Sequence, residues 1–143
     1  MKHALAAACL VVAPLRCLAA DVTLEVDGLD AERLQGSTLM VAVFTDASGW
    51  LRQPQAGHRF ELTPSLAAGG RFRVMLKNLP AGPLALSLFQ DANGNGRLDM
   101  SVLGIPTERY GFSNNASGRF GPPRFEQALL TPGDGQVLKV SMN

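Results

Sequence analysis

The sequence predicts an all-β protein, a single domain built as a seven-stranded antiparallel β-sandwich. Short runs of aliphatic, β-branched and aromatic residues recur along the chain, and glycine, proline, asparagine or aspartate closes each of them. Several runs alternate apolar and polar residues, as strands with one buried face do. The chain has 143 residues, of which 46% are hydrophobic and 17% charged, so one hydrophobic core is expected.

The first 20 residues resemble a secretory signal peptide. A basic start at Lys2 precedes an apolar stretch at residues 4–15 and a small-residue cleavage site at residues 18–20. The apolar stretch is too short to span a bilayer, and Arg16 interrupts its end. We therefore expect an exported protein, periplasmic or extracellular, whose mature domain comprises residues 21–143.

Cleavage would also change the composition of the chain. It would remove Cys9 and Cys17, the only cysteines, which excludes disulfides and thiol chemistry from the mature domain. Removing Lys2 and Arg16 from the 13 basic residues leaves 11 against 12 acidic residues, a formal charge of −1. This balance argues against nucleic acid or an anionic membrane surface as a partner. No second apolar run is long enough for a membrane span.

The strands are assigned in order from the apolar pattern. They are expected at residues 22–26, 38–44, 59–62, 71–76, 84–89, 124–130 and 136–142. The second is almost continuously apolar, as a strand buried on both sides is. Between the fourth and fifth, Pro80 and Pro83 mark a turn, because proline cannot sit in a central ladder. Trp50, in the loop after the second strand, is interpreted as a lid over one end of the core, with an exposed binding aromatic as the alternative.

Residues 91–99 (DANGNGRLD) resemble the beginning of a calcium-binding loop. Oxygen-bearing side chains stand at positions 1, 3, 5 and 9, and a glycine at position 6 allows the sharp bend. The ligands would be the side chains of Asp91, Asn93, Asn95 and Asp99 and the carbonyl of Arg97.

Position 12 of this loop departs from the pattern. Val102 stands where a bidentate glutamate belongs, so Glu108 or a carbonyl of residues 104–106 would have to complete the shell. Affinity is therefore expected to be weak, on the order of 10⁻⁴–10⁻³ M. The alternative is a long hairpin loop in which Gly94 and Gly96 adopt positive φ and the aspartates bond backbone amides.

A second group of candidate residues follows. Two aromatic rings beside amide side chains could bind a sugar or a peptide, or they could plug the end of the sandwich and tie down a loop. The candidate ligand-binding residues are Glu108, Tyr110, Phe112, Asn114 and Asn115. Four arginines also gather in this half of the chain, at positions 97, 109, 119 and 124. We interpret them as solvated charges paired with Asp99, Glu108 and Glu126, with a binding patch as the alternative.

Catalysis has few candidates. His58 is the only histidine after cleavage, and no nucleophile motif accompanies it. Asp91 or Asp99 with Glu108 could in principle act as an acid and base on a glycoside. We expect a non-catalytic binding or structural module of the periplasm or cell envelope, with a glycan or protein partner, and keep a glycan hydrolase as the alternative.

Three motifs together resemble the bacterial domain of unknown function 2141 family. They are DANGNGRLD at residues 91–99, GIP at 104–106 and YGFSNN at 110–115. The resemblance implies an exported β-sandwich of unassigned activity and supplies no catalytic residues. The sequence differs from the family pattern at two positions. Gln90 stands where histidine is frequent, and Ser101 stands where asparagine is frequent. The expected sandwich resembles the transthyretin or carboxypeptidase-regulatory type.

Overall fold

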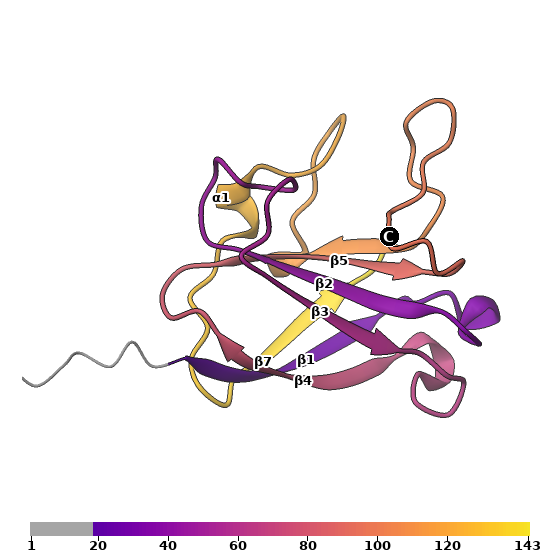
Figure 1. The fold of residues 1–143 in the computed structure, drawn as a ribbon, viewed down its shortest axis with the longest axis horizontal. Coiled ribbons are helices and arrows are strands. Elements are labelled where there is room, and N and C mark those ends of the chain that lie inside the picture. Colours follow the sequence, from indigo (N-terminus) through magenta and orange to yellow (C-terminus); the bar gives the residue numbers. More distant parts are fainter. Residues whose placement is uncertain (1–18) are drawn as a thin grey trace, which may run out of the picture.

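The computed structural model describes residues 19–143, so residues 1–18 of the predicted signal peptide lie outside the described part. The molecule is mostly β and has two open sheets, an arrangement consistent with a β-sandwich (Figure 1). Its elements in chain order are β1 (Ala20–Asp27), η1 (Ala31–Arg33), β2 (Thr38–Phe44), β3 (Ala56–Glu61), η2 (Ala68–Gly70), β4 (Phe72–Leu79), β5 (Ala85–Asp91), β6 (Tyr110–Phe112), η3 (Ser113–Asn115), α1 (Phe125–Ala128) and β7 (Val137–Ser141).

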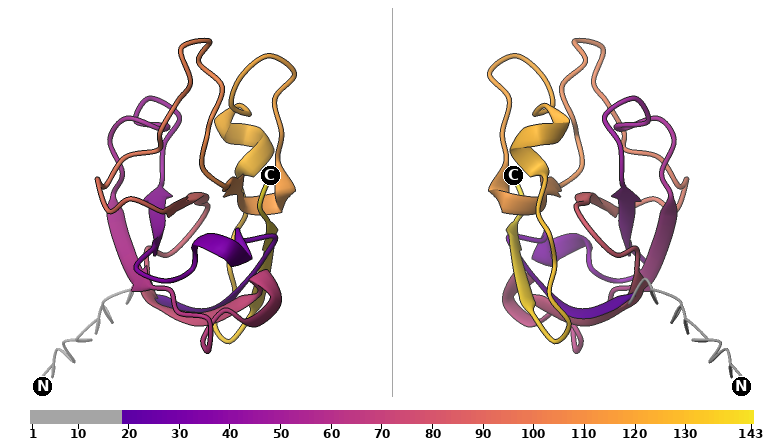
Figure 2. Two further views of the ribbon diagram at one scale, coloured as in Figure 1. Left: turned by 90° about the vertical axis from the view of Figure 1, so that its right-hand side faces the viewer. Right: turned by 90° about the vertical axis from the view of Figure 1, so that its left-hand side faces the viewer.

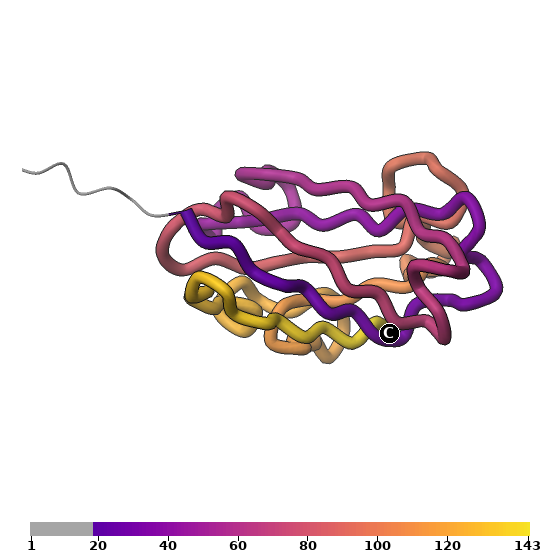
Figure 3. Tube along the Cα trace, turned by 90° about the horizontal axis from the view of Figure 1, so that it is seen from below, coloured from indigo at the N-terminus to yellow at the C-terminus, as the bar shows by residue number. Residues whose placement is uncertain are grey.

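One sheet has the strand order β4-β1-β7 and the other β3-β2-β5-β6. The four-stranded sheet is antiparallel throughout, but β7 runs parallel to β1, with Leu24 opposite Leu138 (Figure 3). The prediction of an entirely antiparallel fold was therefore wrong for this pair. After β6 the chain leaves the four-stranded sheet and joins the three-stranded sheet as β7. There β7 lies next to β1 and runs in the same direction as β1.

Apolar residues of both sheets form the main core between them. The register places Leu39, Val41 and Val43 of β2 opposite Gln90, Leu88 and Leu86 of β5, so these residues share one face. From the three-stranded sheet, alternate residues of β1 and β7 point into the same cluster. The row on β5 ends in a polar side chain, because Gln90 is buried where the next apolar residue would stand.

A smaller apolar cluster covers the other face of the four-stranded sheet. Phe44 of β2 and Phe112 of β6 belong to it together with Phe125 of α1. Trp50 packs on all three rings, with centroid distances of 4.9, 5.8 and 5.8 Å, and its Nε1 donates to the Pro123 carbonyl. The tryptophan thus covers an apolar cluster, but this is the smaller cluster on the other face of the sheet and not one end of the main core, as the prediction had it. Burial on both faces also explains the continuous apolar run of β2.

Asp46 holds the start of the loop that carries Trp50 through hydrogen bonds. Asp46 accepts hydrogen bonds from the Ser48 hydroxyl (2.5 Å) and the Gly49 N–H (2.8 Å). These two donors lower the pKa of Asp46 below its usual value, because they stabilise the ionised carboxylate.

The predicted strand at residues 124–130 was wrong. Residues 125–128 form the short helix α1, which begins after Pro122 and Pro123 and is capped by a bond from the Arg124 N–H to Gln127 Oε1 (2.8 Å). The seventh strand is instead β6, a three-residue strand that the sequence did not indicate. Within residues 19–143, no helix has the length and apolar character needed to cross a membrane.

Candidate functional site

Asp91, the last residue of β5, organises the loop that follows it. Its side chain is fully buried, and one oxygen accepts from the N–H groups of Gly94 (2.8 Å) and Asn95 (3.1 Å). The other oxygen accepts from the N–H of Gly96 (2.8 Å). Gly94 and Gly96 both have φ of +75°, which turns the successive amides toward the carboxylate. Asp91 therefore closes the loop around a buried negative charge.

The other polar side chains of the loop converge on Asp99. Asn93 and Asn95 each donate from Nδ2 to the Asp99 carboxylate, at 2.6 and 2.8 Å. Their Oδ1 atoms accept from the loop backbone, Asn93 from the Asn95 N–H and Asn95 from the Arg97 N–H. The spacing thus brings positions 3, 5 and 9 together, but through amide N–H donors, whereas a cation site requires oxygen atoms to converge. The amide oxygens already have partners, so a cation would have to compete with these bonds.

Glu108 fastens the base of the loop. It is buried, and its two oxygens accept separately from the N–H groups of Ala92 (2.8 Å) and Asp99 (3.0 Å). Thr107 adds two bonds to the Asp99 carbonyl. Both Glu108 oxygens are therefore engaged at the start and end of the loop, and the segment 104–106 lies in a separate turn closed on Ser101.

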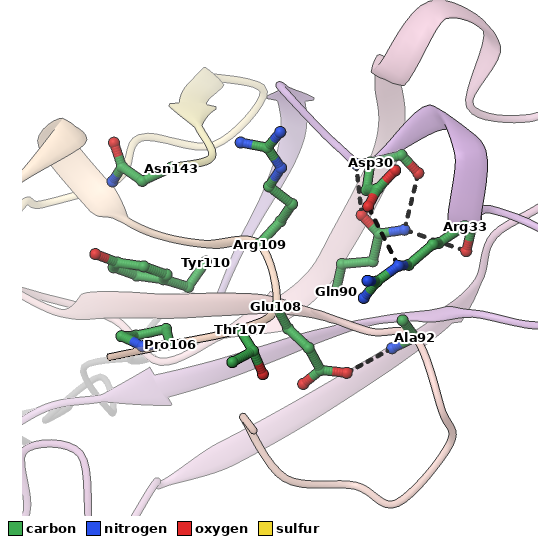
Figure 4. Close-up of a pocket in the computed structure, with 10 residues that line it drawn as sticks. All are labelled: Asp30, Arg33, Gln90, Ala92, Pro106, Thr107, Glu108, Arg109, Tyr110 and Asn143. Atoms are coloured by element: carbon green, nitrogen blue, oxygen red, sulfur yellow. Dashed lines mark hydrogen bonds and ion pairs between the residues drawn. The ribbon is translucent and has the colours of Figure 1, made fainter. Parts of the chain in front are cut away.

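A pocket of about 390 Å³ lies beside this loop base (Figure 4). Ala92 and Glu108 form part of its wall, and Tyr110 of β6 and the terminal Asn143 form another part. The complete lining is Asp30, Arg33, Gln90, Ala92, Pro106, Thr107, Glu108, Arg109, Tyr110 and Asn143. The pocket thus combines two guanidinium groups, two carboxylates and one phenol ring. Asp91 and Asp99, the expected partners of Glu108 in hydrolysis, do not line it.

Gln90 joins the pocket to the turn before β2. Its Oε1 accepts from the Asp30 N–H (2.8 Å), and its Nε2 lies within 3.2–3.4 Å of the Asp30 and Arg33 carbonyls and the Ser37 hydroxyl. Arg33 also pairs with Asp30 at 3.5 Å. The sequence offered one signal for this arrangement, a glutamine at the end of an alternating apolar strand. Nothing in it indicated that Asp30, Arg33 and Asn143 meet there.

The five candidate ligand-binding residues separate into two groups. Glu108 and Tyr110 line the pocket, whereas Phe112 is buried in the smaller apolar cluster. Asn114 donates to the Leu129 carbonyl (2.7 Å), and Asn115 accepts from the Ser141 N–H (2.8 Å). Both asparagines have positive φ, 59° and 49°, and tie η3 to neighbouring backbone. These last three residues act in the structure as packing and loop anchors.

A known family matches the region that contains the loop at residues 91–99, Glu108 and β6. The family model described as "Uncharacterized protein conserved in bacteria (DUF2141)" matches residues 25–139. The chain belongs to this family. The resemblance that the three motifs indicated is thereby confirmed. No curated protein and no solved structure matches the chain significantly.

Membership of the DUF2141 family assigns no ligand to the loop. Among the described residues, no three His, Cys, Asp or Glu side chains gather closely enough to hold a metal ion. The oxygen donors that residues 91–99 offer are instead two carboxylates, two amides and backbone carbonyls. This all-oxygen set suits a hard cation such as Ca²⁺ rather than zinc.

Proposed function

We propose that the protein is an exported, non-catalytic binding module of the cell envelope, with residues 91–99 as a weak calcium site. The pocket beside the loop is the binding site for a polar envelope ligand, a glycan or a protein segment. The framework is a β-sandwich of the transthyretin or carboxypeptidase-regulatory type. The leader-like residues 1–20 support export, since they have the basic, apolar and small-residue regions of a signal peptide.

The observation that carries the proposal is the position of Glu108. One of its oxygens fixes Ala92 in the pocket wall and the other fixes Asp99 at the end of the loop. Ordering of the loop by a cation would therefore also order the pocket wall. The cation would be held by Asp91, Asn93, Asn95, Asp99 and the Arg97 carbonyl. Competition with the existing amide bonds and a ligand charge of only −2 are reasons for weak affinity.

We expect calcium to raise the thermal midpoint of the protein. Binding to the native state alone stabilises it by RT ln(1 + [L]/Kd), which is about 1.4–2.7 kcal/mol at about 10 mM Ca²⁺ and the expected affinity. The midpoint should rise by several degrees relative to EDTA. Asp99→Asn should abolish this rise, because it removes a ligand charge and keeps the shape of the side chain.

The control is Glu61→Gln, which makes the same charge change at an exposed position on β3 and should leave the calcium effect intact. Asp91→Ala is less informative here, because Asp91 also holds three loop amides. A wild-type thermal midpoint that is identical in EDTA and calcium would show that residues 91–99 form a hydrogen-bonded hairpin loop that binds no calcium.

The pocket should bind envelope oligosaccharides or peptides without converting them. In NMR titrations with such fragments, we expect shift changes at Tyr110 and Arg109, and Tyr110→Ala should weaken binding about tenfold through loss of ring contacts. Phe120→Ala, on a separate loop, is the matched aromatic control. Release of cleaved products that depends on Glu108 would contradict a non-catalytic role and favour the hydrolase.

A further inference from the structure

Large apolar side chains are exposed on two loops, at residues that do not line the pocket. Nine such side chains are exposed within residues 19–143, and five of them lie at Met100, Val102, Leu103, Ile105 and Phe120. Val102 and Phe120 are fully exposed, and Leu103 is 82% exposed. The first four belong to the loop at residues 92–109, and Phe120 belongs to the loop at 116–124. We call these the first and second projecting loops.

Both projecting loops rise from the same side of the molecule. In Figure 1 the orange loop near residue 100 and the lighter loop near residue 118 extend beyond the sheets in the same direction. The perpendicular views of Figure 2 show the same two loops projecting at the same end. The two loops that carry the five exposed apolar residues therefore project in the same direction, although they are separate in sequence.

Positive charge accompanies these apolar residues. Residues 100–107 and 116–124 contain no aspartate or glutamate, and Arg119 and Arg124 lie in the second segment. Arg97 and Arg109 flank the first segment, as do Asp99 and Glu108, whose carboxylates accept hydrogen bonds from amide groups at the base of the loop. The sequence-based expectation that these four arginines pair with acidic residues was wrong, since every ion pair found in residues 19–143 involves another cation. All four are exposed and free to meet anionic groups.

The tip of the first projecting loop satisfies part of its own backbone, the N–H groups of residues 101 and 103–105. The Ser101 N–H donates to the Ile105 carbonyl (2.8 Å), and the Gly104 N–H donates to the Ser101 carbonyl (2.9 Å). The Ser101 hydroxyl accepts from the N–H groups of Leu103 and Ile105, at 3.3 and 3.2 Å. A tip of this kind can leave water at low cost, because unbonded polar backbone is what makes burial in lipid expensive.

We propose that the two projecting loops dock this protein on an anionic phospholipid bilayer. Val102, Leu103 and Phe120 enter the boundary between headgroups and acyl chains, and the arginines contact lipid phosphates. Two separate projecting loops with apolar tips suit a fluid phase that closes around each one, whereas a rigid protein partner would need two matched pockets. The net charge gave no sign of this surface, because acidic residues, among them Asp99 and Glu108 at the base of the first projecting loop, offset the arginines in the total. The proposal goes beyond the calcium site and the pocket and requires neither.

Vesicle binding tests the proposal directly. The full chain is mixed in EDTA with vesicles of phosphatidylglycerol and phosphatidylethanolamine, or with vesicles of neutral phosphatidylcholine, and the bound fraction is measured by sedimentation. Leu103→Ser combined with Phe120→Ser should lower the partition coefficient on anionic vesicles at least about tenfold. Leu66→Ser with Met75→Ser removes two exposed apolar side chains from other places and should leave it unchanged. Residues 1–20 are identical in all variants, so differences report on the loops.

A second readout measures insertion. Leu103→Trp and Phe120→Trp should each add tryptophan fluorescence whose emission maximum shifts to shorter wavelength when anionic vesicles are added. The emission maximum of the tryptophan added by Met75→Trp should not shift. Arg119→Gln with Arg124→Gln should weaken binding to anionic vesicles about tenfold and leave binding to neutral ones unchanged. Equal vesicle binding by the wild type and Leu103→Ser/Phe120→Ser, with matched thermal midpoints, would overturn the proposal. So would a change in molecular mass on loop substitution without any vesicle binding, which would indicate contact between copies.

Discussion

Replacing Asp91 by alanine should lower the free energy of unfolding by about 3–5 kcal/mol in EDTA. The carboxylate is fully buried at the end of β5 and accepts three backbone N–H groups from residues 94–96. Hydrogen bonds to a charged group are worth more than neutral ones, and alanine leaves a cavity without any acceptor. Urea unfolding measures the change, and hydrogen exchange at Gly94 and Gly96 should accelerate.

The matched control is Asp99→Ala in the same loop. Its carboxylate accepts only from the Nδ2 groups of Asn93 and Asn95 and is partly exposed, so a loss of about 1 kcal/mol or less is expected. Similar losses in the two variants would contradict the assignment of Asp91 as the residue that closes the loop. Because both measurements are made without calcium, their result does not depend on whether the loop binds a cation.

Much of the fold follows from local apolar pattern. The strands β1, β2, β4, β5 and β7 coincide with runs whose alternation or continuous apolar character is visible in the sequence. Residues 124–130 misled the prediction because Phe125, Ala128 and Leu130 give an apolar run of strand length, whereas the preceding prolines and the Gln127 cap start a helical turn. The parallel pairing of β7 with β1 depends on the path between sheets, which no local pattern encodes.

The candidate site was predictable only within one loop. Alternate polar residues and glycines at 91–99 predicted that Asn93, Asn95 and Asp99 would converge, and their side chains lie within hydrogen-bond distance. The hydrogen bond from the Ala92 N–H to Glu108 joins residues 16 apart in the sequence, and no sequence motif indicates it. The pocket gathers η1, β5, β6 and the terminal Asn143, which are far apart in the sequence. Long-range packing, rather than spacing, creates that part of the site.

Gln90→Leu should lower the free energy of unfolding by about 2–4 kcal/mol. Leucine has a similar volume and would continue the apolar row on β5, so a purely hydrophobic account predicts little loss or even a gain. The hydrogen bonds decide otherwise. The Asp30 N–H would lose its acceptor at 2.8 Å and the Arg33 carbonyl would lose its donor in a partly buried place, whereas the Asp30 carbonyl would keep the Arg33 N–H.

Urea unfolding of Gln90→Leu, beside the exposed control Gln53→Leu, distinguishes the two accounts. We expect a loss near zero for the control, and faster hydrogen exchange at Asp30 in the Gln90 variant, since its amide is held by Gln90 alone among the bonds found in the described residues. Unchanged stability together with unchanged hydrogen exchange at Asp30 would show that the apolar row of β5, and not the side-chain amide of Gln90, stabilises this end of the core. Gln90 also lines the pocket, so its replacement should loosen Arg33 and alter ligand binding there without touching the loop at residues 91–99.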